Sequence, residues 1–329
     1  MALSTFRPGE TWPDADGNHI NAHGGGILVH DGVFYWFGEM RAERASEGVS
    51  VYSSTDLFNW RNEGVALAPV DQPGHDIERG CIMERPKVVR CAATGQFVMW
   101  FHLELKGQGY SAARAAVAVS DTVTGPYTFL RSLRPNGNMS RDMTLFEDED
   151  GAVYHVFASN ENRDLRICRL SEDCLSHTGL DVVAHSDTRE APAVFKYDGT
   201  YYLMTSGCTG WTPNAARVDT AESMLGPWRT GANPAVGPQA ETTYDSQSTF
   251  VLPVPGREGA FIFMADRWNP RNLRDSRYVW LPIRFADDGI VIEWIDEWDL
   301  GWFGAQTDGR ASDPLDEAPG STIGGAGGT

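Results

Sequence analysis

Short apolar runs alternate with polar turns along most of this chain, and the runs come in repeating pairs. The first run of each pair starts on a polar or charged residue, and the second begins at a glycine of the intervening turn. The first runs are HGGGIL (23–28), ERPKVV (84–89), DMTLF (142–146), EAPAVF (190–195) and QSTFV (247–251). The second runs cover residues 32–39, 95–102, 151–159, 199–207 and 259–268. Runs of this length, rich in β-branched and aromatic residues, predict pairs of neighbouring β-strands.

Further runs extend each pair into a unit of three or four strands. Third strands are predicted at 48–54, 114–121, 165–171, 214–221 and 276–283, and outer strands at 55–60, 124–129, 225–230 and 289–294. The lead residues of the first runs, spaced by 61, 58, 48 and 57 positions, are His23, Glu84, Asp142, Glu190 and Gln247. Such a period of short strands is typical of a β-propeller. We therefore predict an all-β fold, a five-bladed β-propeller with four antiparallel strands per blade.

The repeat also predicts the domain organisation. Five units fill residues 1–303, which we interpret as one catalytic propeller domain. Residues 304–329 are rich in Gly, Ala and Asp and have almost no apolar content, so we predict a disordered tail there. No segment shows the convincing periodicity of an amphipathic helix.

The charge of the chain narrows the choice of partners. The 329 residues carry a formal net charge of −18, which disfavours nucleic acid and anionic membranes and fits a neutral ligand better. The five cysteines show no clustered metal-ligand spacing, which favours free thiols. No run approaches the length of a membrane span, and no signal peptide is visible. We expect a cytoplasmic monomer, or a secreted one if a leader is missing from this sequence.

The lead residues carry the candidate chemistry, because five inner strands converge on one axis. Glycoside hydrolysis generally needs one carboxylic acid that protonates the leaving oxygen and a second group that activates water or attacks directly. Glu190 is the best candidate acid, since burial and the nearby Asp142 and Glu84 raise the pKa of its carboxyl group. Asp142 is the natural second carboxylate, and Arg85 compensates part of the clustered negative charge.

Loops after the second strands should surround these lead residues, because alternate strands of a blade run in opposite directions. The loops carry Glu39, residues 102–110, Asn160, Thr209, Trp211 and Asp266. Carboxylate, amide, hydroxyl and indole groups around an acidic funnel suit a polyol, which binds by directional hydrogen bonds and by stacking on aromatic faces.

Seven motifs along the propeller resemble glycoside hydrolase family 43, whose members are five-bladed propellers that invert at the anomeric carbon. They are most similar to its exo-β-1,3-galactanase branch. The motifs are NAHGGGIL (21–28), ERPKV (84–88), SRDMTLF (140–146), REAPAVF (189–195), SGCTGW (206–211), DSQSTF (245–250) and DSRYVWLP (275–282). They lie in the same order and span nearly the whole propeller.

The resemblance implies roles for the lead residues. Glu190 matches the general acid of the family, and Asp142 matches the carboxylate that tunes and orients it. A typical member has an Asp base at the start of blade one, where this chain has His23, a departure that the galactanase branch shares. In that branch a Gln that matches Gln247 holds the attacking water, and a Glu that matches Glu84 is implicated in activity.

The resemblance also implies a substrate and its contacts. The substrate would be β-1,3-galactan, such as the side chains of arabinogalactan, and the residues expected to contact the terminal galactose are Glu39, Tyr110, Asn160, Thr209 and Trp211. We add Arg85 and Asp266 from their positions among the lead residues and loops. Some members hold calcium on the axis, but no calcium-binding loop is recognisable here. We therefore expect no cofactor and leave a structural calcium ion open.

Alternatives remain at this stage. Gln247 orients the water in one version of the mechanism, whereas Glu84 takes the proton in the other. Other specificities within the family are β-galactosidase, α-L-arabinofuranosidase and β-xylosidase. A non-catalytic, sugar-binding propeller is also compatible with the missing blade-one Asp, although it would have no use for the proton donor Glu190.

Overall fold

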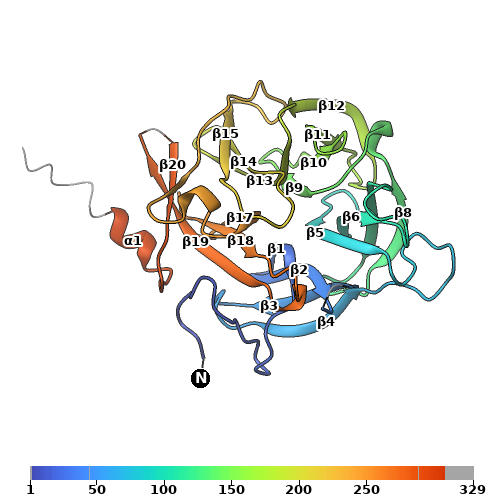
Figure 1. Cartoon of the computed structure of the whole chain (residues 1–329), viewed down its shortest axis with the longest axis horizontal. Coiled ribbons are helices and arrows are strands. Elements are labelled where there is room, and N and C mark those ends of the chain that lie inside the picture. The colour runs from blue at the N-terminus through green and yellow to red at the C-terminus, as the bar shows by residue number, and fades with distance from the viewer. Residues whose placement is uncertain (1, 44, 288, 308–329) are drawn as a thin grey trace, which may run out of the picture.

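The structure, a computed structural model, describes residues 2–43, 45–287 and 289–307. Its strands form five small sheets around a central axis (Figure 1), which confirms the predicted five-bladed propeller. Blade one contains β1 (His23–His30), β2 (Val33–Arg41), β3 (Ser46–Ser54) and β4 (Arg61–Leu67). Blade two contains β5 (Ile82–Arg90), β6 (Phe97–Glu104), β7 (Arg114–Ser120) and β8 (Thr128–Leu133). Blade three contains β9 (Met143–Glu147), β10 (Val153–Ser159), β11 (Asp164–Leu170) and β12 (His177–His185).

The last two blades depart from four strands each. Blade four has three strands, β13 (Arg189–Tyr197), β14 (Thr200–Gly207) and β15 (Arg217–Ala221). Blade five contains β17 (Gln247–Pro253), β18 (Phe261–Arg267), β19 (Arg277–Ala286) and β20 (Gly289–Glu293). Its fifth strand is β16 (Ala235–Val236), which follows blade four in the chain but pairs in parallel with β20. The short helical turns of the described chain are η1 (Pro135–Gly137), η2 (Ala240–Thr242) and η3 (Leu273–Asp275).

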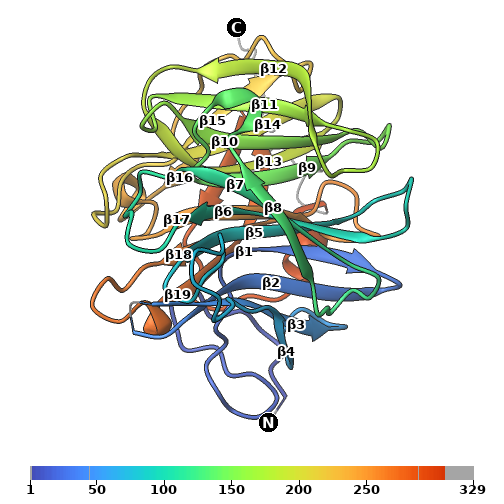
Figure 2. The ribbon, with the colours of Figure 1, turned by 90° about the vertical axis from the view of Figure 1, so that its right-hand side faces the viewer.

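The first strand of every blade lies at the axis. Strand β1 contacts β5 and β17, β9 contacts β5 and β13, and β13 also contacts β17, so the inner strands form a closed ring. Figure 2 shows blade one and blade three on opposite sides of this ring. Side chains at the starts of these strands therefore meet from all five blades.

A bulge follows the lead residue in several inner strands. The pairing register shifts within the segments His23–Gly26, Glu84–Lys87 and Glu190–Ala193. The residue after the lead has a positive φ in each: 57° at Gly24, 52° at Arg85 and 55° at Ala191. A bulge of this kind bends the strand and redirects side chains. Its recurrence at one position shows how the repeat turns the lead residues toward the axis.

Three of the predicted outer strands are wrong. Residues 55–59 form bends. Residues 225–230 form no strand, although Arg229 bridges to Thr220 of β15, and β8 begins at Thr128 instead of 124. The two Gly-Pro segments close turns, in which the amides of Gly125 and Gly226 donate to carbonyl groups three residues earlier. The sequence did not predict β4, β12 or β16, and β12 has no buried residue, so its alternation of apolar and polar positions is weak.

The core lies between neighbouring blades and beneath the outer strands. Four indole side chains, those of Trp36, Trp60, Trp100 and Trp280, are fully buried. The N-terminal segment adds to the packing of blades one and five, because Phe6 exchanges backbone hydrogen bonds with Trp298 at 2.7 and 3.1 Å.

The described chain ends in a short helix, α1 (Trp302–Thr307). This helix covers the first four residues of the predicted tail, and the rest of that tail, residues 308–329, lies outside the described residues. None of the described helices is long and apolar enough to cross a bilayer.

Truncating a core side chain of blade five should lower stability. Val279 in β19 is fully buried, whereas Val65 in β4 is 43% exposed. We expect Val279→Ala to lower the free energy of unfolding by about 2 kcal/mol, because two methyl groups lose their apolar contacts and leave a cavity. Val65→Ala, the matched control, should change it by less than ~0.5 kcal/mol. Urea titration followed by tryptophan fluorescence measures both, and equal effects would contradict the described packing.

Candidate active site

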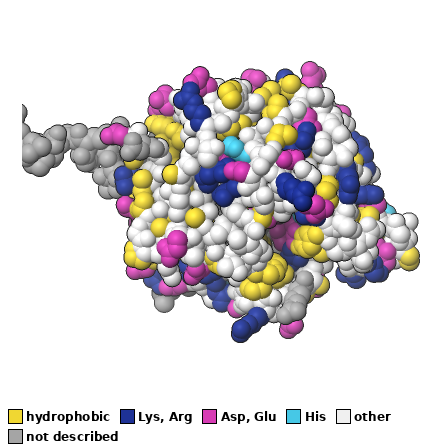
Figure 3. Space-filling view, turned by 45° about the horizontal axis from the view of Figure 1, so that its top comes forward, with side chains coloured by type: hydrophobic (Ala, Val, Ile, Leu, Met, Phe, Trp, Pro, Cys, Tyr) yellow, Lys and Arg dark blue, Asp and Glu magenta, His cyan; other side chains and the backbone are white. Residues whose placement is uncertain are grey.

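A cavity of about 300 Å³ opens over the starts of the inner strands. Figure 3 shows acidic and basic side chains close together around the hollow in this face of the molecule. Most predicted site residues line the cavity: Glu39, Glu84, Arg85, Tyr110, Asp142, Glu190, Trp211, Gln247 and Asp266. The lining also includes residues that we did not assign to the site: Arg41, Arg141, Asn162, Ser206, Asn214, Asp245 and Ser246.

Glu190 sits where a proton-donating carboxyl group is favoured. Burial, and then the negative charge of Asp142, raise the pKa of Glu190 to about 7. Its Oε2 accepts a hydrogen bond from Asn162 at 3.0 Å, and its Oε1 accepts one from Gln247 at 3.0 Å. Asp142 in turn accepts a hydrogen bond from the backbone of Ala191, which fixes it beside the acid. The carboxyl group of Glu190 therefore keeps a proton up to neutral pH.

The side-chain amide of Gln247 has all of its hydrogen-bonding positions occupied. Its Nε2 donates to Glu190 and to Ser206, each at 3.0 Å. Its Oε1 accepts from Arg85 at 2.6 Å and from the indole of Trp268 at 3.1 Å. An amide has two donor hydrogens and two acceptor lone pairs. A water molecule can therefore bind to Gln247 only in place of one of these partners.

Arg85 connects the blades across the axis. Its Nε lies 3.0 Å from Asp142 of blade three, and its Nη1 donates to the carbonyl of Ser248 in blade five. Its Nη2 reaches Gln247, and its own backbone amide donates to Glu39 of blade one at 2.9 Å. The guanidinium is buried, so these partners hold it in one orientation.

Glu84 is an ionised carboxylate, and both of its oxygens contact neighbouring side chains. Its Oε1 accepts hydrogen bonds from Arg41 at 2.8 Å and from Tyr110 at 2.7 Å, and its Oε2 lies 3.1 Å from Nδ1 of His102. Burial opposes ionisation, but contact with His102 and the charge of Arg41 outweigh it and hold the pKa of Glu84 well below its usual range. Such a carboxylate is a weak base.

His102 is held between two carboxylates. Its Nε2 bonds Glu104 at 2.8 Å, on the side of the ring away from Glu84. Burial favours the neutral ring, yet the hydrogen bond to Glu104 and the contact with Glu84 raise the pKa of His102 to about 9. The imidazolium thus supplies one of the positive charges that balance the buried acids.

Glu39 and Arg41 form the buried floor beside Glu84. Arg41 donates to Oε2 of Glu39 through Nε at 2.8 Å and through Nη2 at 2.5 Å. Burial raises the pKa of Glu39 even against the charge of Arg41. The Glu39 carboxylate also packs against Gly24, where an added Cβ would lie 2.2 Å from its Oε1. Gly24 is therefore required for this side chain to reach the site.

Two predicted contacts lie outside the cavity lining. Asn160 and the next two residues all have positive φ, and in this turn Asn160 bonds Asp164 while Asn162 points at the acid. The sequence placed an amide in the correct loop but two positions early. Thr209 bonds the backbone of Thr212 and accepts from Asn214, so it braces the loop that carries Trp211.

Trp211 forms an exposed wall of the cavity. Its side chain is 52% exposed and meets Trp268 edge-on, with ring centroids 5.9 Å apart. An exposed indole braced from behind is suited to stacking on a sugar ring.

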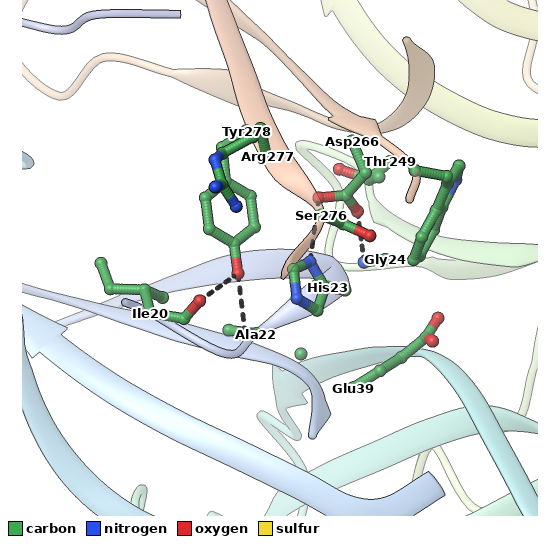
Figure 4. A network of polar contacts seen from close by, with 12 residues as sticks. Ile20, Ala22, His23, Gly24, Glu39, Thr249, Asp266, Ser276, Arg277 and Tyr278 are labelled. Carbon is green, nitrogen blue, oxygen red and sulfur yellow. Dashed lines mark hydrogen bonds and ion pairs between the residues drawn. The ribbon is translucent and has the colours of Figure 1, made fainter. Parts of the chain in front are cut away.

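The blade-one lead residue does not reach the cavity. His23 is fully buried and stacks on Tyr278, with ring centroids 5.1 Å apart (Figure 4). Its Nδ1 lies 3.6 Å from Asp266 of blade five, and neither ring nitrogen has a hydrogen-bond partner among the described residues. Asp266 lines the cavity in its place.

A metal ion does not fit the acidic cluster well. Glu84, His102 and Asp142 each offer a ligand atom within 4.8 Å of the others. Arg41 and Arg85, however, already neutralise the two carboxylates. On the axis, the buried ammonium group of Lys87 donates to the carbonyl of Gly24 at 2.9 Å. Burial, and then the charge of Arg85, lower the pKa of Lys87 to about 7. These basic groups take positions that an oxygen-bound calcium ion would need.

Solved structures of known sugar hydrolases are similar to nearly the whole chain. The β-1,3-galactosidase BT3683, solved with galactodeoxynojirimycin, is 50% identical with a TM-score of 0.88, and the match covers 90% of this chain and 100% of that one. The β-1,3-galactosidase BT0265 is 42% identical with a TM-score of 0.90, over 93% and 66% of the two chains. An exo-β-1,3-galactanase from Phanerochaete chrysosporium, solved with β-1,3-galactotriose, is 36% identical with a TM-score of 0.84, over 91% and 68%.

A more distant relative and a family description agree with these similarities. A xylan 1,3-β-xylosidase from a Vibrio species is 24% identical over 62% of this chain, which spans only 38% of the length of that protein. Glycosyl hydrolases family 43 matches residues 26–250. With the cavity of carboxylates at the propeller axis, these matches lead to one conclusion: the chain belongs to glycoside hydrolase family 43 and is a glycoside hydrolase.

Proposed function

We propose that this enzyme is an inverting, exo-acting glycosidase that releases galactose from β-1,3-galactan, such as the side chains of arabinogalactan. The observation that carries the proposal is Glu190, a half-buried carboxyl group with a pKa of about 7 in a cavity lined by further carboxylates. The two β-1,3-galactosidases and the exo-β-1,3-galactanase described above support galactose as the sugar.

Glu190 is the proton donor in the proposed reaction. It transfers its proton to the glycosidic oxygen as the bond from that oxygen to the anomeric carbon breaks. Asp142 keeps the proton on Glu190 before reaction by its negative charge, and its hydrogen bond from Ala191 holds it in place. Water attacks the opposite face of the sugar, which inverts the anomeric configuration.

Gln247 and Glu84 support the attack in different ways. We assign Gln247 the orientation of the water, since an amide is a poor base, and this requires it to exchange one of its four hydrogen bonds for the water. We assign Glu84 a stabilising negative charge near the developing oxocarbenium ion, because its low pKa makes it a poor proton acceptor.

The shape of the cavity supports attack at a chain end. Its floor is closed by Glu39 and Arg41, which are 1% and 4% exposed. A terminal sugar fits above such a floor, whereas an internal sugar would need an exit on the far side. Trp211 stands at the exposed rim, where it would stack on the next sugar or on the leaving group.

Product analysis tests the proposed function directly. The enzyme should release galactose from β-1,3-galactobiose and β-1,3-galactan, and NMR should show the α-anomer first. Arabinosyl and xylosyl substrates in parallel test the other specificities of the family. Early β-galactose would refute inversion, and turnover of only the pentosyl substrates would refute the sugar assignment.

Replacing the acid should remove most of the activity but not sugar binding. We expect Glu190→Gln to lower kcat on β-1,3-galactobiose by about 10²–10⁴-fold, because the amide has no proton to donate. The loss should be smaller on a dinitrophenyl β-galactoside, whose leaving group needs no proton. Glu147→Gln in β9, away from the cavity lining, is the matched control and should keep full activity. Equal losses on both substrates would argue against Glu190 as the acid.

The pH profile should report the charge of Asp142. Because Glu190 must be protonated to act, kcat/KM should be maximal below its pKa of about 7 and should fall as the pH rises through that value. Asp142→Asn removes a charge that raises this pKa, so the fall should move to lower pH by roughly one unit. An unshifted profile on the natural substrate would show that Asp142 does not tune the acid.

A further inference from the structure

Asp266 reaches from blade five to the place where blade one lacks a carboxylate. It lies on β18 directly across from Gln247 on β17, and it lines the cavity. Its Oδ2 accepts a hydrogen bond from the backbone amide of Gly24 at 2.5 Å, and its Oδ1 faces His23 (Figure 4). Gly24, whose amide anchors Asp266, is therefore the residue that follows His23, the lead residue of blade one.

Asp266 has an oxygen free to accept a proton. Within the described chain no group donates a hydrogen bond to its Oδ1, and the nearest charged partner, Nδ1 of His23, is 3.6 Å away. Glu84 differs, since one oxygen already accepts two hydrogen bonds and the other contacts His102. Glu39 accepts donors on both oxygens, from Arg41 and from the backbone of Arg85.

In the described part of the chain Asp142 also has an oxygen without a hydrogen-bond donor, but it lies on the side of the acid. Its charge raises the pKa of Glu190, and it is bonded to the residue next to that acid. Gln247 separates Asp266 from the acid, because its side chain bonds Glu190 while its backbone pairs with Asp266. Inverting sites hold their two carboxyl groups roughly 6.5–9.5 Å apart, which makes room for the water.

The surroundings of Asp266 combine neutral and basic groups. His23 of β1 contacts its carboxylate, and the ammonium group of Lys87 on β5 and the phenol of Tyr278 on β19 interact with its charge through space. His23 is pinned between Tyr278 and Asp266, and its ring nitrogens have no other hydrogen-bond partner within the described residues. The imidazole is thus placed against the carboxylate and limits its orientation.

We propose that Asp266 is the general base of this enzyme and that His23 is its positioning residue. This inference rests on the proposed inverting function. As the water oxygen forms its bond to the anomeric carbon, one water proton passes to Oδ1 of Asp266. The glycosidic bond breaks at the same time, and its oxygen takes the proton of Glu190. Asp266 thereby supplies from blade five what a blade-one Asp supplies in a typical family member.

Azide rescue tests the assignment. Asp266→Asn and Asp266→Ala should lower kcat on a dinitrophenyl β-galactoside by about 10²–10⁴-fold. Azide, which is a nucleophile that needs no base, should restore turnover in proportion to its concentration and yield α-galactosyl azide. Asp219→Asn is the matched control, because Asp219 is also a buried Asp that contacts a histidine, His185 at 2.9 Å, but lies outside the cavity lining. It should keep wild-type kcat and show no response to azide.

Two further measurements separate the possible failures. Calorimetric binding of galactose to each variant shows whether its site is folded, and Glu84→Gln is assayed with azide alongside. Rescue of Glu84→Gln but not of the Asp266 variants would overturn the proposal, as would near wild-type activity of Asp266→Asn. The α-anomer test on the wild-type enzyme is independent of both, so a retaining or inactive wild type would instead refute the proposed function.

The test of His23 as a positioning residue needs a measurement that the loss of a purely structural residue would not change. We expect His23→Gln to lower kcat of the enzyme with natural substrate more than it raises KM, and azide should partly restore turnover. A matching loss of thermal stability without any response to azide would make His23 a packing residue only.

Discussion

The site depends on one buried guanidinium. Arg85 binds groups from blades three and five through its side chain and from blade one through its backbone amide, and it belongs to blade two itself. Its left-handed φ of 52° is uncommon for a residue with a side chain and is held by the bulge after Glu84. Without this cation, Asp142 and the oxygen of Gln247 would lose their common partner, and the inner strands would meet across the axis with unpaired charge.

Charge balance explains how so many acids share one cavity. Arg41 lies between Glu39 and Glu84, His102 lies between Glu84 and Glu104, and Arg85 lies beside Asp142. Among the described residues no such cation contacts Glu190, which is held by two amides instead. Burial and the charge of Asp142 raise the pKa of Glu190, whereas His102 and Arg41 hold the pKa of Glu84 low, so the same cluster keeps one carboxyl group protonated and another ionised.

The sequence predicted the inner half of each blade better than the outer half. Inner strands are largely buried and read as strong apolar runs that start at lead residues, so the fold and the lead residues that line the cavity followed from them. Outer strands such as β12 have no buried residue and carry a weak pattern, and the Gly-Pro segments read as strands are turns. Asn160 and Thr209 lie outside the cavity lining, because loop backbone conformation sets side-chain direction and leaves little trace in the pattern. At Asn160, three consecutive residues have positive φ.

Other features of the site had no sequence signal at all. Arg41 and Asn162 are single polar residues that act by hydrogen bonds to a neighbouring blade, to Glu84 and to Glu190 respectively. The partnership of His23 with Asp266 joins positions more than two hundred residues apart, and it appears only once the ring is closed.

The pairing of β16 with β20 also bears on how this fold can change. The segment that follows blade four contributes its short strand to the edge of blade five, so the units of the sequence repeat and the sheets of the structure do not coincide there. A blade cut at the repeat boundary would lack an edge strand or carry one with no partner. Propellers made of self-contained repeats can duplicate or exchange single blades. This half of the ring cannot, and blades four and five must be inherited together.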